Sequence, residues 1–182
     1  MKRTKIVLMS CCAPCSADAV KKLRAEGRDF IVLFYNPNIF PRAEYDRRLA
    51  EQIRLCEKYG AKFAVGEYEP EAWLQCVKGL EREPERGARC EKCFLMRLKW
   101  GAKWAAEHGY DSITSVFGVS PHKNQAQVDA AAETAIKSCR APRAAYENPG
   151  FGYAPEPDMY RQKYCGCAPA LAGMAKGGGD GE

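Results

Sequence analysis

Cysteine is the residue most able to do chemistry in this 182-residue chain, which contains ten of them. Seven lie in three short groups, which are Cys11, Cys12 and Cys15; Cys90 and Cys93; and Cys165 and Cys167. Thiolate sulfur binds soft metals and exchanges electrons with other thiols. The chain has only two histidines, too few for a histidine-rich metal site. The composition therefore predicts sulfur-based metal or redox chemistry.

The first group lies between an apolar run at residues 5–9 and apolar positions with helical spacing, a pattern that predicts a strand, a tight loop and a helix. In parallel α/β sheets, ligands bind at the carboxyl edge where such loops lie. A helix N-terminus also supplies N–H groups and a partial positive charge, which stabilise anionic sulfur. Cys11 and Cys12 are therefore predicted to be functional, with Cys15 facing the same way from the first helical turn.

The second group, Cys90-x-x-Cys93, opens a predicted helix at residues 90–108, where thiolates at positions i and i+3 project on one side. Together with Cys11 and Cys12 it gives four thiolates, which satisfy either a tetrahedral zinc ion or a 4Fe-4S cluster. Sequence alone leaves both open. Cys11 and Cys12 are adjacent in sequence, and Cys90 and Cys93 lie far along the chain from them. This spacing is unlike that of a zinc ribbon and favours a cluster built at the sheet edge.

The third group, Cys165-Gly166-Cys167, has a spacing suited to a strained and easily reduced disulfide, because a bridge would close a very small ring. Gly166 allows the backbone bend. Such a pair can give up two electrons by closing and can be reset by an external dithiol. The remaining cysteines, Cys56, Cys76 and Cys139, lie in or at the end of predicted helices and are expected to act as small hydrophobic residues.

The elements that must position these thiols alternate along the chain. Further strands are predicted at residues 30–35, 61–65, 112–117 and 143–147, and further helices at 42–59, 69–80 and 124–137. This alternation predicts an α/β fold, a parallel sheet with flanking helices of the HUP or Rossmann-like kind. We expect one catalytic domain over residues 1–171 and a glycine-rich, disordered tail over 172–182.

The amino-acid composition excludes several classes of protein. Hydrophobic residues are 46% and charged residues 28% of the chain, which excludes intrinsic disorder, and no segment is apolar enough to span a bilayer. The basic start lacks the apolar core of a signal peptide, so we expect a cytoplasmic protein with reduced thiols and no membrane partner. The net charge of +5 weakly favours a polyanionic partner.

Five motifs then occur in order. They are Cys11-Cys12-Ala13-Pro14-Cys15, Tyr35-Asn36-Pro37-Asn38-Ile39, Arg89-Cys90-x-x-Cys93-Phe94-x-x-Arg97-Leu98, Ser120-Pro121-His122-Lys123-Asn124 and Tyr160-Arg161-Gln162-x-Tyr164-Cys165-Gly166-Cys167. Over residues 5–168 this series resembles the cobalamin-independent epoxyqueuosine reductases. The resemblance implies an oxidoreductase that converts the epoxide of epoxyqueuosine, at the wobble position of a tRNA anticodon, to the alkene of queuosine.

The resemblance also implies roles for residues. Cys11, Cys12, Cys90 and Cys93 match the ligands of a 4Fe-4S cluster, and Cys165 with Cys167 match a redox-active disulfide pair. Cys15 stands where some relatives hold a ligand of an additional mononuclear iron. Tyr35, Lys123 and Arg161 are candidate substrate contacts, for a tRNA carrying epoxyqueuosine, and an unidentified electron donor is required. The proline-rich stretch 138–159 is shorter than this family leads us to expect.

Three other functions remain as alternatives. A zinc-stabilised RNA-binding domain would use the four thiolates without catalysis. A HUP-type tRNA-modifying enzyme of other chemistry would need a phosphate-binding loop, but the loop at residues 10–14 has no glycine. A thiol oxidoreductase acting on protein disulfides would explain Cys165 and Cys167, but it would assign no role to the cysteine groups at residues 11–15 and 90–93.

Overall fold

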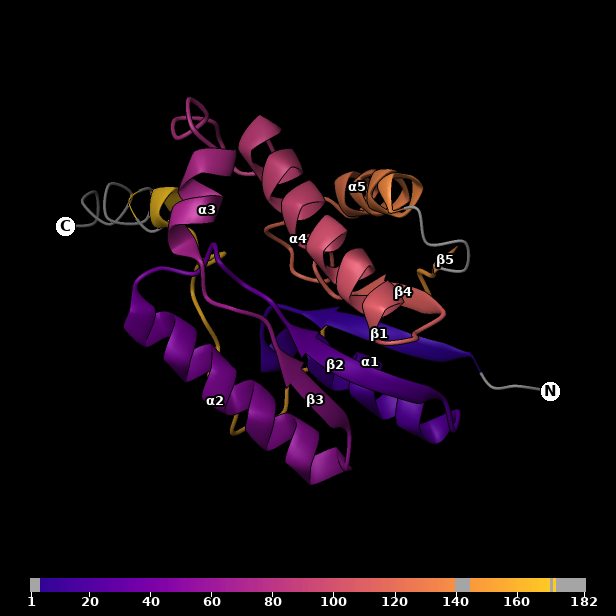
Figure 1. Ribbon diagram of the computed structural model, residues 1–182. Coiled ribbons are helices and arrows are strands. Elements are labelled where there is room, and N and C mark those ends of the chain that lie inside the picture. The colour runs from indigo at the N-terminus through magenta and orange to yellow at the C-terminus, as the bar shows by residue number, and fades with distance from the viewer. Residues whose placement is uncertain (1–3, 140–144, 171, 173–182) are drawn as a thin grey trace.

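A five-stranded parallel sheet organises the computed structural model, which describes residues 4–139, 145–170 and 172 (Figure 1). The strands are β1 (Lys5–Ser10), β2 (Asp29–Phe34), β3 (Lys62–Val65), β4 (Ser112–Ser115) and β5 (Ala145–Tyr146). Their order is β3-β2-β1-β4-β5, and every neighbouring pair is parallel. The predicted α/β class with a parallel sheet is confirmed.

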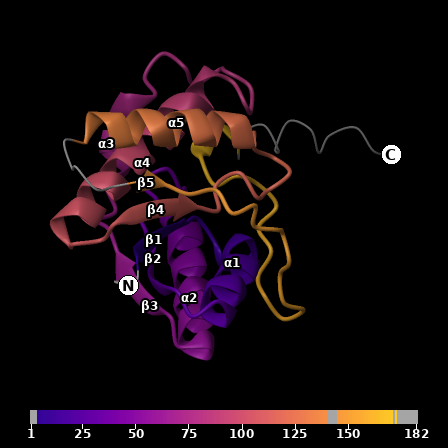
Figure 2. The same ribbon diagram turned by 90° about the vertical axis from the view of Figure 1, so that its right-hand side faces the viewer.

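The helices form a layer on each face of the sheet. They are α1 (Ala13–Ala25), α2 (Arg42–Tyr59), α3 (Pro70–Cys76), α4 (Ala88–Glu107) and α5 (Gln125–Ser138). Helices α1 and α2 cover one face, and α4 and α5 cover the other, as Figures 1 and 2 show. Because both faces are covered, β1 and β2 are buried from their second residue onward and read as continuous apolar runs.

Local sequence explains where several helices begin and end. Gly60 follows α2 with φ of 60°, a left-handed conformation that glycine adopts without strain. Asn124 precedes α5, and its side chain accepts a hydrogen bond from the Ala126 N–H at 2.9 Å. Pro14 lies in the first turn of α1, where its missing N–H costs nothing.

The order of the strands reverses between β1 and β4, and this reversal fixes where a ligand can bind. Strands β2 and β3 extend the sheet from one side of β1, whereas β4 and β5 extend it from the other. Loops that leave such a switch point in opposite directions open a crevice at the carboxyl edge. The Cys11–Cys12 turn follows β1, and the loop that carries Lys123 follows β4, so both lie at this crevice.

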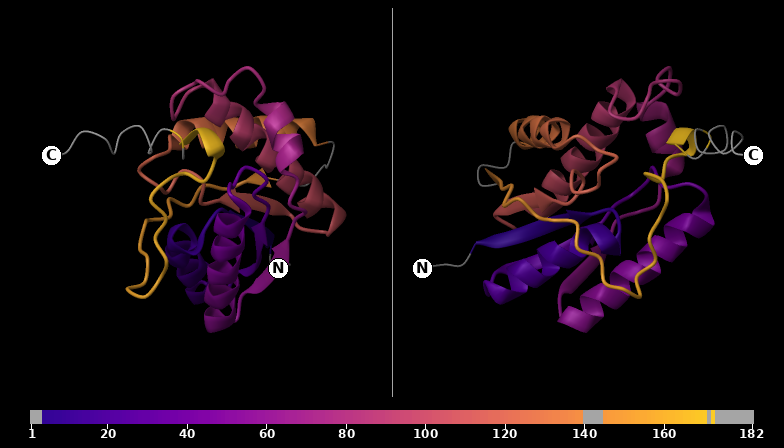
Figure 3. Two further views of the ribbon diagram at one scale, coloured as in Figure 1. Left: turned by 90° about the vertical axis from the view of Figure 1, so that its left-hand side faces the viewer. Right: turned by 180° about the vertical axis from the view of Figure 1, so that it is seen from behind.

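The aperiodic stretch after β5 is held against the first helical layer. It crosses the outside of α1 and α2 in the view from behind (Figure 3). The Gly152 N–H donates to Asp18 of α1 at 2.7 Å, and Lys58 of α2 donates to Glu156 at 2.7 Å. These polar contacts, together with Met159 in the main core and Phe151 packed against it, fix the path of this stretch.

Some boundaries differ from the sequence prediction. Helix α3 ends at Cys76 rather than at 80, since a turn follows in which Gly79 has φ of 84°. Strand β4 ends at Ser115, whose hydroxyl accepts from the Phe117 N–H at 2.9 Å and turns the chain from the sheet. The predicted tail lies outside the described residues except for Ala172, as do the first residues of the predicted last strand. No helix in the described ranges is long and apolar enough to cross a membrane.

Candidate metal and redox centre

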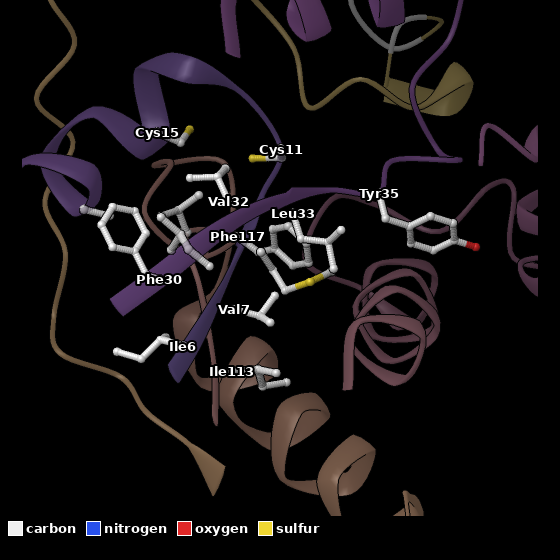
Figure 4. Close-up of a cluster of buried hydrophobic side chains, with 14 of the residues drawn as sticks. Ile6, Val7, Cys11, Cys15, Phe30, Val32, Leu33, Tyr35, Ile113 and Phe117 are labelled. Atoms are coloured by element: carbon white, nitrogen blue, oxygen red, sulfur yellow. The ribbon is translucent and has the colours of Figure 1, made fainter. Parts of the chain in front are cut away.

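Three buried thiols meet at the turn between β1 and α1. The sulfur atoms of Cys11, Cys12 and Cys15 all lie within 4.8 Å of one another, and those of Cys11 and Cys12 are 3.8 Å apart. Figure 4 shows Cys11 and Cys15 at this end of the apolar core. Within residues 4–139, 145–170 and 172, this is the one group of three or more metal-ligating side chains found that close together. Sequence reasoning predicted this proximity.

A buried polar network holds the turn in shape. The Ser16 hydroxyl donates to the Cys12 carbonyl at 2.7 Å and lies 2.5 Å from the Ser10 hydroxyl, which in turn donates to Gln52 Oε1 at 2.6 Å. The Asn36 amide donates to the Ser10 carbonyl at 2.9 Å. Because each of these polar groups has a partner, the turn can be buried without the penalty of unpaired groups.

The three thiols differ in acidity. Hydrogen bonds from Cys12 and Cys15, helped by the charges of Lys123 and Arg97, hold the pKa of Cys11 well below its usual range. Burial raises the pKa of Cys12 to about 12, and hydrogen bonds to Cys11 raise that of Cys15. Cys11 is therefore the thiol of this group that most readily becomes a metal-binding thiolate.

The second pair lies at the start of α4. Cys93 is buried and Cys90 is half-buried, one helical turn apart, and burial raises the pKa of Cys90. Both line a small cavity whose wall also includes Cys165 and Cys167. Arg97, on the next turn of α4, is fully buried and donates to the Tyr35 carbonyl at 3.3 Å and to the Asn36 side chain.

The third pair lies between the other two. Cys165 lines the cavity that contains Cys90 and Cys93, and it also lines a second cavity of about 90 Å³ that contains Cys11 and Cys15. All ten cysteines are free in this structure. A hydrogen bond with Cys167 holds the pKa of Cys165 well below its usual range and raises that of Cys167. The predicted Cys165–Cys167 disulfide thus remains a prediction about the oxidised protein.

Arg48 anchors the third pair, a role that sequence reasoning missed. Its fully buried guanidinium donates to the carbonyls of Tyr164 at 3.1 Å and Cys165 at 3.0 Å, and to the Glu44 carboxylate at 2.7 Å. In the amphipathic pattern of α2, an arginine among other charges indicates a solvent-facing position. Its spacing from the buried residues Tyr45, Leu55 and Cys56 was the signal that could have placed it on the inner face of the helix.

Two polar side chains reach the first group from distant motifs. The Lys123 ammonium lies 3.8 Å from the Cys11 sulfur, and the Gln162 amide donates to the Cys12 sulfur at 2.8 Å. Burial alone would lower the pKa of Lys123, but the thiols of Cys11 and Cys165 raise it above its usual range. Lys123 therefore stays charged and favours negative charge on the sulfurs.

The other predicted site residues, Arg161 and Tyr35, differ in their exposure to solvent. Arg161 is exposed, which suits contact with a phosphate. Tyr35 is buried, and its ring stacks on Trp100 with 4.1 Å between centroids. Figure 4 shows its ring directed away from Cys11 and Cys15. Tyr35 thus holds the Arg97 guanidinium through its carbonyl, with its side chain in the core.

The isolated cysteines lie as expected of small hydrophobic residues. Cys56 is buried in the main core, and Cys139 packs partly buried at the end of α5. The Cys76 thiol donates to the Lys92 carbonyl at 3.7 Å. None of the three lines either thiol cavity in the described part of the chain.

The residues present fit an iron–sulfur cluster. Six thiols line the two cavities that share Cys165, and Cys12 lies with Cys11 and Cys15, so the chain can supply four thiolates to a cluster and keep Cys165 and Cys167 as a separate pair. Arg89, Arg97 and Lys123 border these thiols, and no carboxylate of the described residues lies within ion-pair distance of them. Buried cations need a balancing anion, and a thiolate-bound cluster carries negative charge.

An open pocket of about 700 Å³ adjoins the thiols. It shares His122 and Tyr164 with the cavity at Cys11 and shares Arg89 with the cavity at Cys90. Its other walls come from the loop at residues 81–85 and from the segment after Cys167. A substrate much larger than the inner cavities can therefore approach the thiols from this side.

Comparisons with known proteins agree with the motifs. A family model described as epoxyqueuosine reductase QueH matches residues 6–172. Epoxyqueuosine reductase QueH of Histophilus somni is 37% identical over 175 residues, covering 92% of this chain and 72% of that protein. The protein of the same name from Staphylococcus epidermidis is 38% identical over 191 residues, covering 97% of this chain and 79% of the relative.

A solved structure shares the fold. It is described as a predicted subunit of tRNA methyltransferase from Methanocaldococcus jannaschii, with a TM-score of 0.54 and 11% identity. The superposition covers 95% of this chain and 74% of the other. At this identity the likeness concerns the fold alone, and it agrees with the predicted HUP or Rossmann-like architecture.

Proposed function

The chain belongs to the epoxyqueuosine reductase QueH family, and from this premise we propose that it reduces epoxyqueuosine to queuosine in tRNA with an iron–sulfur cluster and a dithiol. The observation that carries the proposal is the position of Cys165, which lines one cavity with Cys11 and another with Cys90 and Cys93. A reductase needs a dithiol beside its metal-binding thiols as a source of electrons, whereas an RNA-binding domain needs none.

Four thiols are proposed to hold the 4Fe-4S cluster, namely Cys11, Cys12, Cys90 and Cys93. The cluster would supply electrons one at a time, and a separate iron with an open position would attract the oxygen. Cys15 shares the first group with Cys11 and Cys12 but is not needed as a fourth ligand. It is the proposed ligand of an additional mononuclear iron.

The reaction balances with the third pair as the reductant. Converting the epoxide to an alkene requires two electrons and two protons, and the oxygen leaves as water. The Cys165 and Cys167 sulfurs supply both electrons when they form a disulfide, the Cys167 thiol supplies one proton and solvent supplies the other, so the products are one alkene, one disulfide and one water. An external dithiol or equivalent donor must then reduce the disulfide before the next turnover.

Neighbouring residues position the reductant. Arg48 holds the carbonyls of Tyr164 and Cys165, and the Phe40 N–H donates to the Gly166 carbonyl at 2.7 Å. The Cys167 sulfur holds a proton that can be delivered as the oxygen leaves, while the Lys123 ammonium stabilises negative charge near Cys11. The substrate approaches through the 700 Å³ pocket, and exposed Arg161 contacts a phosphate of the tRNA. Because tRNA is its substrate, the protein is proposed to act in the cytoplasm.

The first experiment is anaerobic purification, followed by iron and acid-labile sulfide analysis and an EPR spectrum before and after dithionite. We expect about four irons and four sulfides per chain and a reducible brown chromophore. The protein is then assayed on tRNA that contains epoxyqueuosine. A colourless protein with one zinc and no turnover would contradict the proposal and favour the RNA-binding alternative.

Single substitutions separate the roles of the thiols. We expect Cys90→Ala to lose both colour and turnover, because it removes a cluster ligand. Cys167→Ala should keep the colour and lose turnover, because it removes only the dithiol. Cys139→Ala, which alters a partly buried thiol outside both cavities, is the matched control and should keep both. Retained activity in either of the first two variants would refute the assigned role.

A further inference from the structure

Two buried hydrogen-bond donors at the thiol cavity have no partner. They are Trp73 Nε1 and Arg89 Nε, and each residue has only 3% of its surface exposed. Both residues line the cavity whose wall also carries Cys90, Cys93 and Cys167. A buried donor left without an acceptor has lost its hydrogen bond to water without replacing it, which is unfavourable. Two such donors at one cavity indicate that an acceptor belongs inside it.

The chemistry of the two groups restricts that acceptor. An indole or guanidinium N–H can donate but cannot accept, so the missing partner must carry lone pairs or negative charge. Asn38 Oδ1 also lines this cavity and is buried without a partner, but sulfur is its main acceptor, since four of its nine lining residues are cysteines. Sulfur atoms bound to iron carry more negative charge than neutral thiols and accept hydrogen bonds better.

The surrounding structure holds both donors in place. Trp73 of α3 packs in a small apolar cluster with Val77, Cys93 and Cys167. Arg89 is fixed by its Nη1 atom, which donates to the carbonyls of Glu81 at 3.1 Å and Glu83. Neither side chain can therefore rotate toward solvent and donate its unpaired N–H to water.

We propose that Trp73 Nε1–H and Arg89 Nε–H donate hydrogen bonds to the sulfur atoms of the iron–sulfur site at Cys90 and Cys93, and thereby raise its reduction potential. The inference rests on the proposed function, because it needs the cluster to be present. Reduction adds negative charge to the cluster, and donors to its sulfurs stabilise the reduced form more than the oxidised form. Both residues thus act as positioning residues that tune the cluster without binding iron.

The test is an EPR-monitored redox titration of anaerobically purified Trp73→Phe. Phenylalanine keeps an aromatic ring in the apolar cluster and removes the N–H. We expect the iron and sulfide content of the unaltered protein and a more negative midpoint potential. The comparison is made at a solution potential equal to the midpoint potential of the unaltered protein. There the ratio of reduced to oxidised cluster should be several-fold lower in the variant. A tenfold lower ratio corresponds to a midpoint potential that is 59 mV more negative, for transfer of one electron.

Trp104→Phe is the matched control. Trp104 stacks on His108 near the far end of α4, with 3.9 Å between ring centroids, and lines neither thiol cavity. We expect this variant to keep the midpoint potential of the unaltered protein. An equal shift in Trp104→Phe and Trp73→Phe would overturn the proposal, because it would reflect a general loosening of the fold.

Two further variants test the proposal if Trp73→Phe does not assemble the cluster. Replacing Trp73 with β-(3-benzothienyl)alanine exchanges the N–H for sulfur and keeps the size of the ring system. Arg89→Lys removes the Nε–H and keeps the positive charge. Each should lower the midpoint potential, and the same iron content with an unchanged or higher potential in these variants would overturn the inference.

The failure of the proposed function is distinguishable from failure of this inference. If the unaltered protein contains no iron and shows no turnover on modified tRNA, both fall before any variant is compared. If it contains the cluster and is active, but its potential does not respond to loss of either N–H, only the inference falls.

Discussion

At the scale of single residues, Arg48 joins the helix that starts after β2 to the segment that carries the proposed redox pair, Cys165 and Cys167. Its side chain is 1% exposed, and its hydrogen bonds reach Glu44 and the carbonyls of Tyr164 and Cys165. Since these partners are more than a hundred residues apart in sequence, one buried cation fixes a long-range contact next to the thiols.

Replacing Arg48 should reveal this coupling. Arg48→Met leaves the nearly buried Glu44 carboxylate without its cation and with only the Tyr160 hydroxyl as partner; breaking such a buried ion pair typically costs about 3–5 kcal/mol of unfolding free energy. The double variant Arg48→Met with Glu44→Gln should cost less than the sum of the two single changes. Urea denaturation of all four proteins measures this cycle. Arg42→Met, in an exposed pair with Asp46, should change the stability little, and additive costs at Arg48 and Glu44 would contradict the account.

Gly166 is the second residue on which the redox pair depends. Its φ of 119° is costly for other residues, and an added Cβ would lie 3.0 Å from Arg48 Nη1. We expect Gly166→Ala to lose about 1–3 kcal/mol of stability and to slow turnover while keeping the cluster.

The control for Gly166 separates backbone strain from contact with Arg48. Gly150 also has positive φ, at 67°, but an added Cβ there would meet nothing within 4 Å. Gly150→Ala should therefore keep its turnover, measured on the same modified tRNA. Equal turnover in the two variants would show that the contact with Arg48 does not matter.

At the scale of elements, the stretch after β5 carries the last motif to the crevice. Its Glu156 accepts from Lys58 at 2.7 Å and from the Tyr59 hydroxyl, and it pairs with Lys21 at 3.1 Å. These contacts fasten the stretch to both α1 and α2. They allow Gln162 to reach the Cys12 sulfur a few residues later.

Glu156 should make the stability of the protein depend on pH. The Lys58 ammonium, with the Tyr59 hydroxyl, lowers the pKa of Glu156 from 4.5 to about 2. Its contribution is complete above about pH 4.5 and is lost as the pH falls toward about 2. Glu156→Gln should therefore lose about 1–2 kcal/mol near neutral pH, discounted because both lysines are partly exposed. The difference should shrink in acid.

Chemical denaturation at about pH 7 and about pH 3 checks this dependence on pH. Glu57→Gln is the control, because Glu57 is exposed on the same helix as Lys58. It should change stability little at either pH. A difference between Glu156→Gln and the unaltered protein that stays constant, or grows, in acid would contradict the role assigned to Glu156.

At the scale of the whole molecule, the thiols lie at the switch point of a doubly wound sheet. Three segments far apart in sequence meet there: the turn after β1, the start of α4 and the segment 160–167. The basic residues beside them face a crevice rather than a broad surface, and the net charge is only +5. Binding of tRNA should therefore rest on few phosphate contacts.

The salt dependence of tRNA binding tests this expectation. The affinity should fall with salt concentration, and Arg161→Gln should reduce the slope of log K against log salt by about 1. Lys103→Gln alters an equally exposed cation on α4 that pairs with Glu107, and it should leave the slope unchanged. Equal slopes for Arg161→Gln and the unaltered protein would remove Arg161 from the interface.

The sequence by itself determined the elements and the chemistry. Continuous apolar runs predict β1 and β2 because a covered parallel strand has two buried faces. The adjacent thiols of Cys11 and Cys12 predict a sulfur site because the turn after β1 must lie at the carboxyl edge. Both inferences use contacts between residues close in sequence, which a periodic pattern and a motif record directly.

Only the tertiary structure decided which side chains support that site. Arg48 has the polarity of a surface residue, and Trp73 that of an ordinary core residue, yet both lie beside the redox thiols. Tyr35, part of a motif, directs its ring into the core against Trp100. The physical reason is that the partners of these side chains depend on packing between segments distant in sequence, and composition and spacing carry no record of that packing.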